Sequence, residues 1–354
     1  MICGHGSRSK SAESEFSLLA KGLQKRYPEI PVEFGFLEFS APNIHMGLDT
    51  LREKGVDLII AIPGMLFAAT HAKNDIPSVL MTYQQKYPGL KISYGRELGL
   101  HPKMIAAFET RIKEVLGDQA SNNENLYDFM LVVVGRGTSD TFANAEAAKL
   151  TRIVAENLGF GWSETVYSGV TFPSVGKGIE MALKIGYQKV VVAPYFLFSG
   201  KLIDRIYNYV DHVAAGETNI QFFKAHYLAD HEYVIDTFVQ RIKEAQSGEI
   251  SENRGLMASF KERLALGEVS IHHHHSEYQP SKNATLHQDH LHHSESTSEH
   301  QHNHVHNFYK HIGHPNGPRT MIDQGVCSCF MSQIPEEVVE AQRQSNKTKN
   351  KSVK

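Results

Sequence analysis

The amino-acid sequence predicts an α/β protein of two duplicated domains, each a four-stranded parallel sheet flanked by helices, followed by a histidine-rich, largely disordered tail. Three observations carry this prediction. Short apolar runs alternate with amphipathic stretches, which is typical of parallel strands joined by helices. Similar residues recur at an offset of 131, which becomes 130 near the end of the second copy, and the composition turns polar after residue 247. We therefore expect domains at 1–123 and 124–246 and a tail at 247–354.

An internal repeat relates the two domains. Gly4-His5-Gly6-Ser7 returns 131 positions later as Gly135-Arg136-Gly137-Thr138. Further matches follow in the same order: 40–42 with 171–173, 59–63 with 190–194, and 111–114 with 241–244. Because unrelated segments would not keep one register over such a length, we infer a duplicated fold.

The second domain shows the expected elements clearly, beginning with a buried strand at 129–134, where the apolar run is unbroken. A helix at 141–158 follows, with Ala145, Ala148, Leu150 and Val154 on its inner face. The same alternation predicts strands near 164–168, 189–193 and 220–225, and helices at 173–185, 201–213 and 231–245. The first domain repeats this order.

The first strand is shorter in the first domain than in the second. About six residues precede Gly135 in its strand, whereas only Met1, Ile2 and Cys3 precede Gly4. A central parallel strand of three residues loses ladder hydrogen bonds and apolar burial. We therefore expect the natural chain to begin a few residues earlier.

Composition and charge exclude several classes of protein. Lys and Arg number 36 against 39 Asp and Glu, so no broad basic face for nucleic acid is expected. The longest apolar run, 58–70, contains Pro63 and Gly64 and is too short to span a bilayer. No secretory leader is visible, and three cysteines cannot form a disulfide framework in a chain this long. We expect a cytoplasmic protein without a membrane or nucleic-acid partner.

The histidines fall into two groups. Fourteen of the 21 lie between His272 and His314, and the other seven are scattered through the two domains. Two of the seven, His5 and His71, follow predicted strands and so lie at the carboxyl edge of the sheet, where open parallel sheets bind ligands. Neutral imidazole binds divalent cobalt, iron, nickel and zinc. These two side chains therefore form a candidate metal site.

The repeat provides a control for this interpretation. The counterparts of His5 and His71 in the second domain are Arg136 and Leu202. The second domain keeps the glycines and prolines of the scaffold and lacks both imidazoles. The fold therefore does not require the two histidines, which favours a functional role over a structural one. His101 and His231 are repeat equivalents at helix starts, where we expect a structural role.

Three segments of the first domain together resemble the class II chelatases. They are Gly4-His5-Gly6-Ser7-Arg8, the Phe-Leu-Glu-Phe-Ser-Ala-Pro segment at 36–42 and the His-Ala-Lys-Asn-Asp-Ile-Pro segment at 71–77. More closely, the chain resembles the long sirohydrochlorin chelatases of the CbiX and SirB types. The resemblance covers about 1–246, and Gly135-Arg136-Gly137-Thr138 is similar to their degenerate second half.

The resemblance implies insertion of a divalent metal into sirohydrochlorin, with no ATP and no organic cofactor. It makes His5 the proton acceptor and a metal ligand, and His71 a second metal ligand. The expected contacts with the macrocycle are Glu38, Phe39, Leu66, Phe67, Ala68, Ala69 and Thr70.

Positively charged residues near the site are candidate anchors for the carboxylates of such a substrate. These candidates are Arg8, Lys73, Arg96 and Arg136. The alternative for each is ordinary solvated surface charge.

The tail offers two further features. The irregular His-rich tract at 272–314 is predicted to capture or buffer metal for the site, and a spacer that binds metal only incidentally is the alternative. Cys327-Ser328-Cys329 departs from the Met-X-Cys-X-X-Cys iron–sulfur motif of long cobaltochelatases. Two thiolates from each chain of a homodimer could share a cluster, whereas two reduced thiols are the alternative.

We therefore predict a sirohydrochlorin cobaltochelatase that takes up Co²⁺ and releases two protons. Two histidines do not discriminate cobalt from iron or nickel, so a ferrochelatase that makes siroheme is an alternative. A third interpretation is a non-enzymatic metal storage or delivery protein that uses its His-rich tail.

Overall fold

The computed structural model describes residues 1–7, 9–121, 125–217, 219–247 and 255–271. Arg8, the His-rich tract and Cys327 and Cys329 lie outside the described residues, so the predictions made for them remain predictions.

The first half carries the elements expected from the alternating pattern, with two short additions. In chain order they are β1 (Ile2–Gly4), α1 (Lys10–Arg26), β2 (Phe34–Phe36), α2 (Ile44–Glu53), β3 (Leu58–Pro63), the π-helix η1 (His71–Asp75), α3 (Ile76–Lys86), β4 (Lys91–Tyr94), α4 (Pro102–Leu116) and α5 (Asp118–Ser121). The second half agrees with its predicted elements to within a few residues. It comprises β5 (Phe129–Gly135), α6 (Thr141–Leu158), β6 (Trp162–Tyr167), α7 (Val175–Ile185), β7 (Lys189–Pro194), α8 (Lys201–Gly216), β8 (Gln221–Lys224) and α9 (Glu232–Ser247), after which α10 (Leu256–Ala265) follows.

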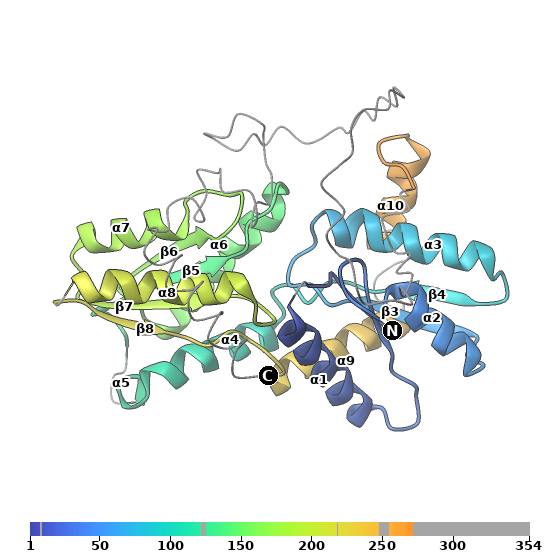
Figure 1. Ribbon diagram of the computed structural model, residues 1–354, viewed down its shortest axis with the longest axis horizontal. Coiled ribbons are helices and arrows are strands. Elements are labelled where there is room, and N and C mark those ends of the chain that lie inside the picture. The colour runs from blue at the N-terminus through green and yellow to red at the C-terminus, as the bar shows by residue number, and fades with distance from the viewer. Residues whose placement is uncertain (8, 122–124, 218, 248–254, 272–354) are drawn as a thin grey trace, which may run out of the picture.

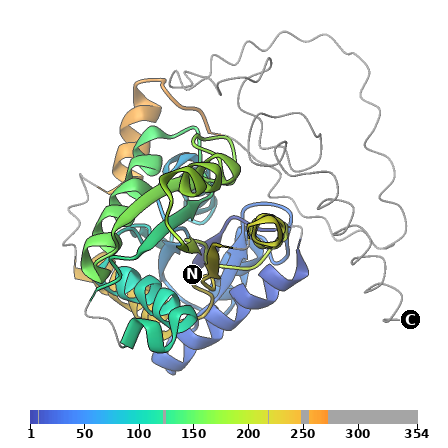
Figure 2. The same ribbon diagram turned by 90° about the vertical axis from the view of Figure 1, so that its left-hand side faces the viewer.

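Two four-stranded parallel sheets form the centre of the molecule, one in each half (Figure 1). Their strand orders, β2-β1-β3-β4 and β6-β5-β7-β8, are the same, which confirms the predicted duplication. The second half, at the left of Figure 1, faces the viewer in Figure 2. Strands β1 and β3 are adjacent, and the chain continues from β1 to β2 on one side and from β3 to β4 on the other. The loops that follow β1 and β3 therefore flank the position at which open parallel sheets bind ligands.

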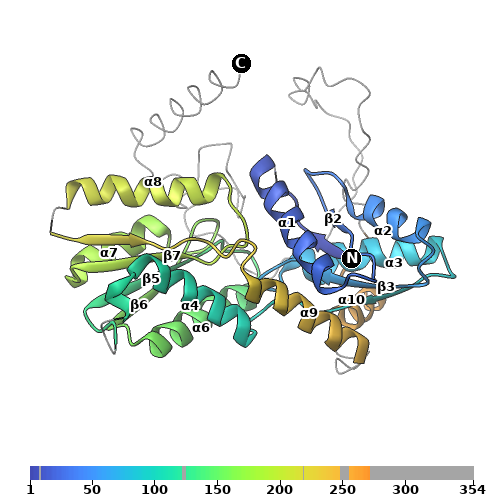
Figure 3. The same ribbon diagram turned by 90° about the horizontal axis from the view of Figure 1, so that it is seen from below.

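The halves exchange their last helices. Helix α4 of the first half packs against α6 and β8 of the second, and α9 of the second packs against β3 and α1 of the first (Figure 3). One buried core therefore runs through both halves, and separate cores fill the outer faces of the two sheets. Burial on both faces explains the apolar runs of the central strands.

Equivalent arginines hold the exchanged helices. Arg111 on α4 donates to the Leu228 carbonyl at 3.0 Å, and Arg241 on α9 donates to the Leu98 carbonyl at 2.7 Å. His101 likewise caps α4, where its Nδ1 accepts a hydrogen bond from the Lys103 amide. His231 accepts the corresponding bond from the Tyr233 amide. The structural role expected for both histidines agrees with this geometry.

The structure adds one element that was not predicted, because α10 lies in the segment after residue 247. Phe260 is fully buried, and Leu256 and Met257 pack against the outer core of the first half. The apolar residues recur at helical spacing inside a polar segment, so overall composition concealed them. None of the described helices is long and apolar enough to cross a membrane.

Candidate metal centre

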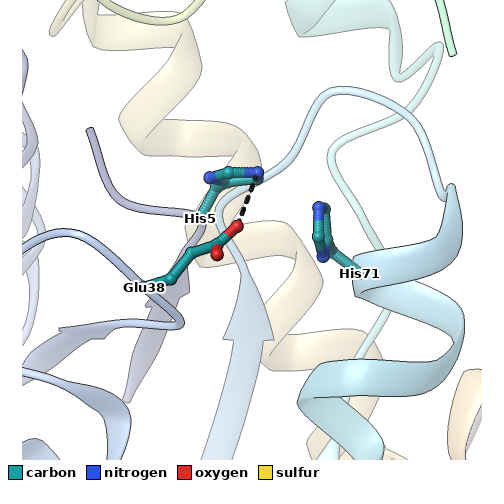
Figure 4. A group of neighbouring side chains, drawn as sticks. All are labelled: His5, Glu38 and His71. Carbon is teal, nitrogen blue, oxygen red and sulfur yellow. Dashed lines mark ion pairs between the residues drawn. The ribbon is translucent and has the colours of Figure 1, made fainter. Parts of the chain in front are cut away.

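Three potential metal ligands converge where β1, β2 and β3 end. His5 follows β1, Glu38 follows β2, and His71 opens η1 after the loop that leaves β3. One ligand atom from each lies within 4.8 Å of the others, and all three side chains are half-buried. Figure 4 shows the imidazoles and the carboxylate turned toward a common point. The structure thus brings together the two histidines singled out in the sequence.

Close approach of two loops places His5 beside Glu38. Gly6 has φ +98°, and a Cβ at this position would lie 1.7 Å from the Glu38 carbonyl oxygen, so only glycine fits. The Glu38 amide donates to the His5 carbonyl at 3.0 Å. The Ser40 hydroxyl accepts from the Ser7 amide at 2.9 Å and donates to the Ser7 carbonyl at 2.7 Å. The backbone therefore fixes both ligand-bearing loops.

His5 presents a neutral ring nitrogen to the cluster. Its Nδ1 donates to the Gly6 carbonyl at 3.2 Å, which leaves a lone pair on Nε2, 3.5 Å from the Glu38 Oε1. Burial, then the neighbouring His71 and the positive charge of Arg136, lower the pKa of His5 to about 3. Two electron-rich atoms face each other here, and a cation between them would turn repulsion into attraction.

His71 is oriented by a buried carboxylate one turn away. Its Nδ1 donates to Asp75 Oδ2 at 2.6 Å, and the Asp75 side chain is only 5% exposed. This bond fixes the tautomer in which Nε2 carries the lone pair, as in carboxylate–histidine–metal sites. The rings of His71 and His5 lie edge to face with centroids 4.4 Å apart.

A proline explains the π-helical turn that carries His71 and Asp75. An α-helix would need the amide of residue 77 to donate to the carbonyl of Lys73, but Pro77 has no N–H and its ring clashes with that carbonyl. The helix widens instead, and the Ile76 amide donates to the His71 carbonyl five residues back. Such π-helical turns are frequent at functional sites.

The expected macrocycle contacts fall into two groups. Phe39 is 54% exposed, has φ 64°, and stacks on His5 with ring centroids 6.2 Å apart. A non-glycine residue at positive φ is strained, and such strain concentrates at binding sites. Leu66 and Phe67 instead pack partly into the core between the halves, Phe67 against Tyr195. Ala68 and Ala69 are half-buried and Thr70 is exposed, so this part of the loop remains accessible.

The candidate carboxylate anchors have different surroundings. Arg136, the counterpart of His5, is exposed, and its charge acts on both His5 and Glu38. Lys73 forms an ion pair with Asp140, which caps α6 of the second half. Arg96 is exposed after β4. Arg136 therefore has the position expected of an anchor, whereas Lys73 already has an anionic partner.

Sequence reasoning missed two contributions to the cluster. Glu38 was expected to contact the macrocycle, yet its carboxylate completes a set of two imidazoles and one carboxylate. Such a set leaves positions of a divalent metal open for exchange. Asp75 was not predicted to have any role. The spacing of four residues from His71 was the signal, because residues so spaced face each other on a helix.

Comparison with known proteins gives a consistent result. The family described as CbiX matches residues 1–115 and 130–245. A sirohydrochlorin cobaltochelatase of Priestia megaterium is 35% identical over 278 residues, covering 77% of this chain and 87% of that protein. A sirohydrochlorin ferrochelatase of the same organism is 28% identical over 243 residues, covering 68% of this chain and 88% of that protein.

Solved structures agree with the sequence relatives. SirB from Bacillus subtilis with Fe³⁺ superposes with a TM-score of 0.62 at 26% identity, over 72% of this chain and 97% of that chain. A second SirB structure, from Bacillus subtilis subspecies spizizenii in complex with cobalt, gives a TM-score of 0.58 at 25% identity, over 71% and 96%.

Proposed function

The chain belongs to the CbiX family of sirohydrochlorin chelatases, and from this premise we propose that it inserts Co²⁺ into sirohydrochlorin. The reaction exchanges one divalent metal for the two N–H protons of the free-base macrocycle. The single observation that carries the proposal is the convergence of His5, Glu38 and His71 at the carboxyl edge of the first sheet.

The three side chains divide the work of metal exchange. Nε2 of His5, Nε2 of His71 and a Glu38 oxygen replace water on the incoming ion, while open positions remain for the pyrrole nitrogens. Because Asp75 fixes the ring of His71, that ligand binds without first having to reorient. The ion is thus partly dehydrated before it meets the macrocycle.

The pyrrole protons leave through the same cluster. With its pKa lowered to about 3, His5 is unprotonated at neutral pH and available to accept a proton. A Glu38 oxygen lies 3.5 Å from Nε2 of His5 and is the next proton acceptor. Because Nδ1 donates to the Gly6 carbonyl, His5 has one lone pair, on Nε2. This nitrogen accepts a pyrrole proton once the ion has moved from it to the macrocycle, and the proton then passes through Glu38 to solvent.

The substrate's carboxylates supply the second recognition element. The positive charge of Arg136, on the second half, acts on both His5 and Glu38, and a guanidinium binds a carboxylate through two parallel hydrogen bonds. Exposed Phe39 offers an aromatic face to the flat macrocycle. Residues of the first half would then bind the metal, and Arg136 of the second half would bind a carboxylate of the substrate.

The choice of cobalt has two supports. The cobaltochelatase relative is more similar and is matched over more of this chain than the ferrochelatase relative. The His-rich tract at 272–314 suits the capture of cobalt or nickel. Iron is the alternative, because ferrochelatases are also close relatives and the ligand set accepts either ion.

One assay tests the proposal. The full chain is mixed anaerobically with sirohydrochlorin and Co²⁺, Fe²⁺ or Ni²⁺, and insertion is followed by the absorption change of the macrocycle. We expect all three rates to exceed the uncatalysed ones and the highest kcat/KM for Co²⁺. No acceleration with any metal would refute the chelatase, and a higher kcat/KM for Fe²⁺ would replace cobaltochelatase by ferrochelatase.

A further inference from the structure

Helix α10 lies outside both duplicated halves, yet it packs on the turn that carries His71. It contacts η1 and α3 and stands beside α3 in Figure 1. Phe260 is fully buried, which holds the helix in place. Arg263, one turn further along the helix, is half-buried and directed at η1.

The Arg263 guanidinium makes hydrogen bonds that fit an opened helical turn. Its Nη2 donates to the Lys73 carbonyl at 2.8 Å, and its Nη1 donates to Asn74 Oδ1 at 2.7 Å. The Lys73 carbonyl is the acceptor that Pro77, lacking an N–H, cannot satisfy in an α-helix. The nitrogen Nε donates to the Ser259 carbonyl at 3.2 Å, so the guanidinium is also tied back to its own helix.

The two residues that Arg263 holds lie between His71 and Asp75. Any rotation of Lys73 or Asn74 would therefore change the separation of the imidazole from the carboxylate that orients it. Lys73 is held on another side by its ion pair with Asp140. The π-helical turn is thus restrained both by the second half and by α10.

The second half shows what happens without the proline. Asn208 stands at the position of Pro77 and retains its amide, and α8 is α-helical from Lys201 to Gly216. Its counterpart of His71 is Leu202, which binds no metal. The π-helical turn occurs in the half that carries His71, and there Arg263 of α10 donates hydrogen bonds to it.

We propose that Arg263 is a positioning residue of the metal centre: it stabilises the π-helical turn in which Asp75 directs Nε2 of His71 toward His5 and Glu38. Helix α10 is thereby part of the site, although it lies outside the repeat. This inference rests on the proposed metal insertion, but its structural half, the restraint of η1, can be measured independently.

The test compares three variants of the full chain. Arg263→Gln removes the charge and the forked donors, and Arg263→Lys keeps the charge with a single donor group. Lys261→Gln is the matched control, since Lys261 is exposed on the same helix and the charge change is identical. Steady-state insertion rates are measured in two series, one with varied free Co²⁺ and one with varied sirohydrochlorin. A metal buffer sets the free Co²⁺ concentration, so that metal binding by the His-rich tract does not change it. Amide hydrogen exchange of the peptide spanning 71–78 is measured in parallel.

We expect Arg263→Gln to raise the KM for Co²⁺ about ten-fold, as is usual when the outer support of a metal ligand is lost. The KM for sirohydrochlorin should stay unchanged, and amide hydrogen exchange in 71–78 should accelerate. Arg263→Lys should have a KM for Co²⁺ and an exchange rate between those of the wild type and Arg263→Gln. Lys261→Gln should match the wild type. An unchanged KM for Co²⁺ or unchanged exchange in 71–78 would overturn the proposal, as would faster exchange throughout the first half, which indicates general destabilisation. If the wild type inserts no metal, the proposed function fails, and the exchange comparison alone decides whether Arg263 restrains η1.

Discussion

The two halves of the molecule share a scaffold and differ where their strands end. In each half, a hydroxyl on one loop accepts from the amide and donates to the carbonyl of a residue on a neighbouring loop. Ser40, after β2, bonds Ser7, after β1, and Thr171, after β6, bonds Thr138, after β5. Arg111 and Arg241 then hold the exchanged helices in the same way. These features build the fold, because they persist in the half that lacks the metal cluster.

The residues of the cluster are replaced together in the second half. The replacement at the position of Asp75 is instructive, because Asp75 and its counterpart Ile206 are both buried. Burying a carboxylate is costly, and an apolar residue fills this position in the other half. The fold therefore does not require a carboxylate at this position, which favours a role for Asp75 in orienting His71. The counterparts of His5, Glu38, His71 and Asp75 are Arg136, Gly169, Leu202 and Ile206.

The comparison predicts its largest effect when the first half is made to resemble the second. His5→Arg and His71→Leu should each lower the insertion rate by about 100-fold or more, the scale on which loss of a positioned acid–base group acts. Both residues should be tolerated by the fold, since the second half carries them. The measurement is kcat/KM for Co²⁺ together with the thermal midpoint, and His101→Asn serves as a control outside the site. A variant that retains a tenth of the wild-type rate contradicts the assignment.

Replacement of Asp75 separates orientation of the ligand from the ligand itself. Asp75→Ile introduces the residue of the second half and leaves His71 free to rotate. We expect the KM for Co²⁺ to rise by about 10- to 100-fold, as for other lost partners of ligating histidines, while the melting temperature stays level or rises. Wild-type metal affinity in this variant would show that the 2.6 Å bond does not serve the site.

Much of this architecture could be predicted because the repeat made it visible twice. The bounds of the helix at 141–158 and the strand beginning at Lys189 agree with prediction, since buried strands and amphipathic helices have distinct apolar periods. The predicted inner face of that helix was partly wrong: Leu150 and Val154 are buried, but Ala145 and Ala148 are exposed. His5 and His71 were found because the second half lacks them. A single copy would have left their role open.

The remaining features depend on contacts between segments far apart in the chain. No local pattern reports that α4 and α9 exchange halves. Lys73 was expected to be available to substrate, yet it pairs with Asp140, 67 positions away. Likewise Arg263 reaches η1 from a segment whose composition predicted disorder. Such pairings arise from tertiary packing, which propensity and periodicity do not encode.

The contribution of the second half is tested at Arg136. Arg136→Gln should raise the KM for sirohydrochlorin about ten-fold, because a hydrogen bond to a charged group contributes roughly 1.5–3 kcal/mol. The KM for Co²⁺ should not rise, since loss of a positive charge near His5 favours a cation. Steady-state kinetics in which sirohydrochlorin and Co²⁺ are varied in turn measure the two KM values separately. A rise only in the metal KM would remove Arg136 from the list of carboxylate anchors.

A smaller effect is expected from the His-rich tract, which follows α10 in the sequence. Deleting 272–354 leaves α10 intact and should not change insertion at saturating Co²⁺. With total metal scarce, insertion should slow by about two- to five-fold if the tract raises the local metal concentration. The two conditions are compared in the same absorption assay. Equal rates under scarce metal would make the tract an incidental binder.

The smallest expected effect is a difference in acid sensitivity, since His5 titrates and Arg136 remains charged throughout. The pKa of His5 is about 3 in the folded protein and about 6.5 when unfolded. Below pH 6.5 the unfolded chain therefore binds a proton that the folded chain does not, so stability attributable to neutral His5 is present above pH 6.5 and is lost as the pH falls toward 3. His5→Gln does not titrate and should lose less melting temperature between pH 7 and pH 5 than the wild type, by about 2–4 °C for each kcal/mol of difference. Thermal melts of both proteins with a chelator present measure this, and parallel pH profiles would mean that folding leaves the pKa of His5 near its ordinary value.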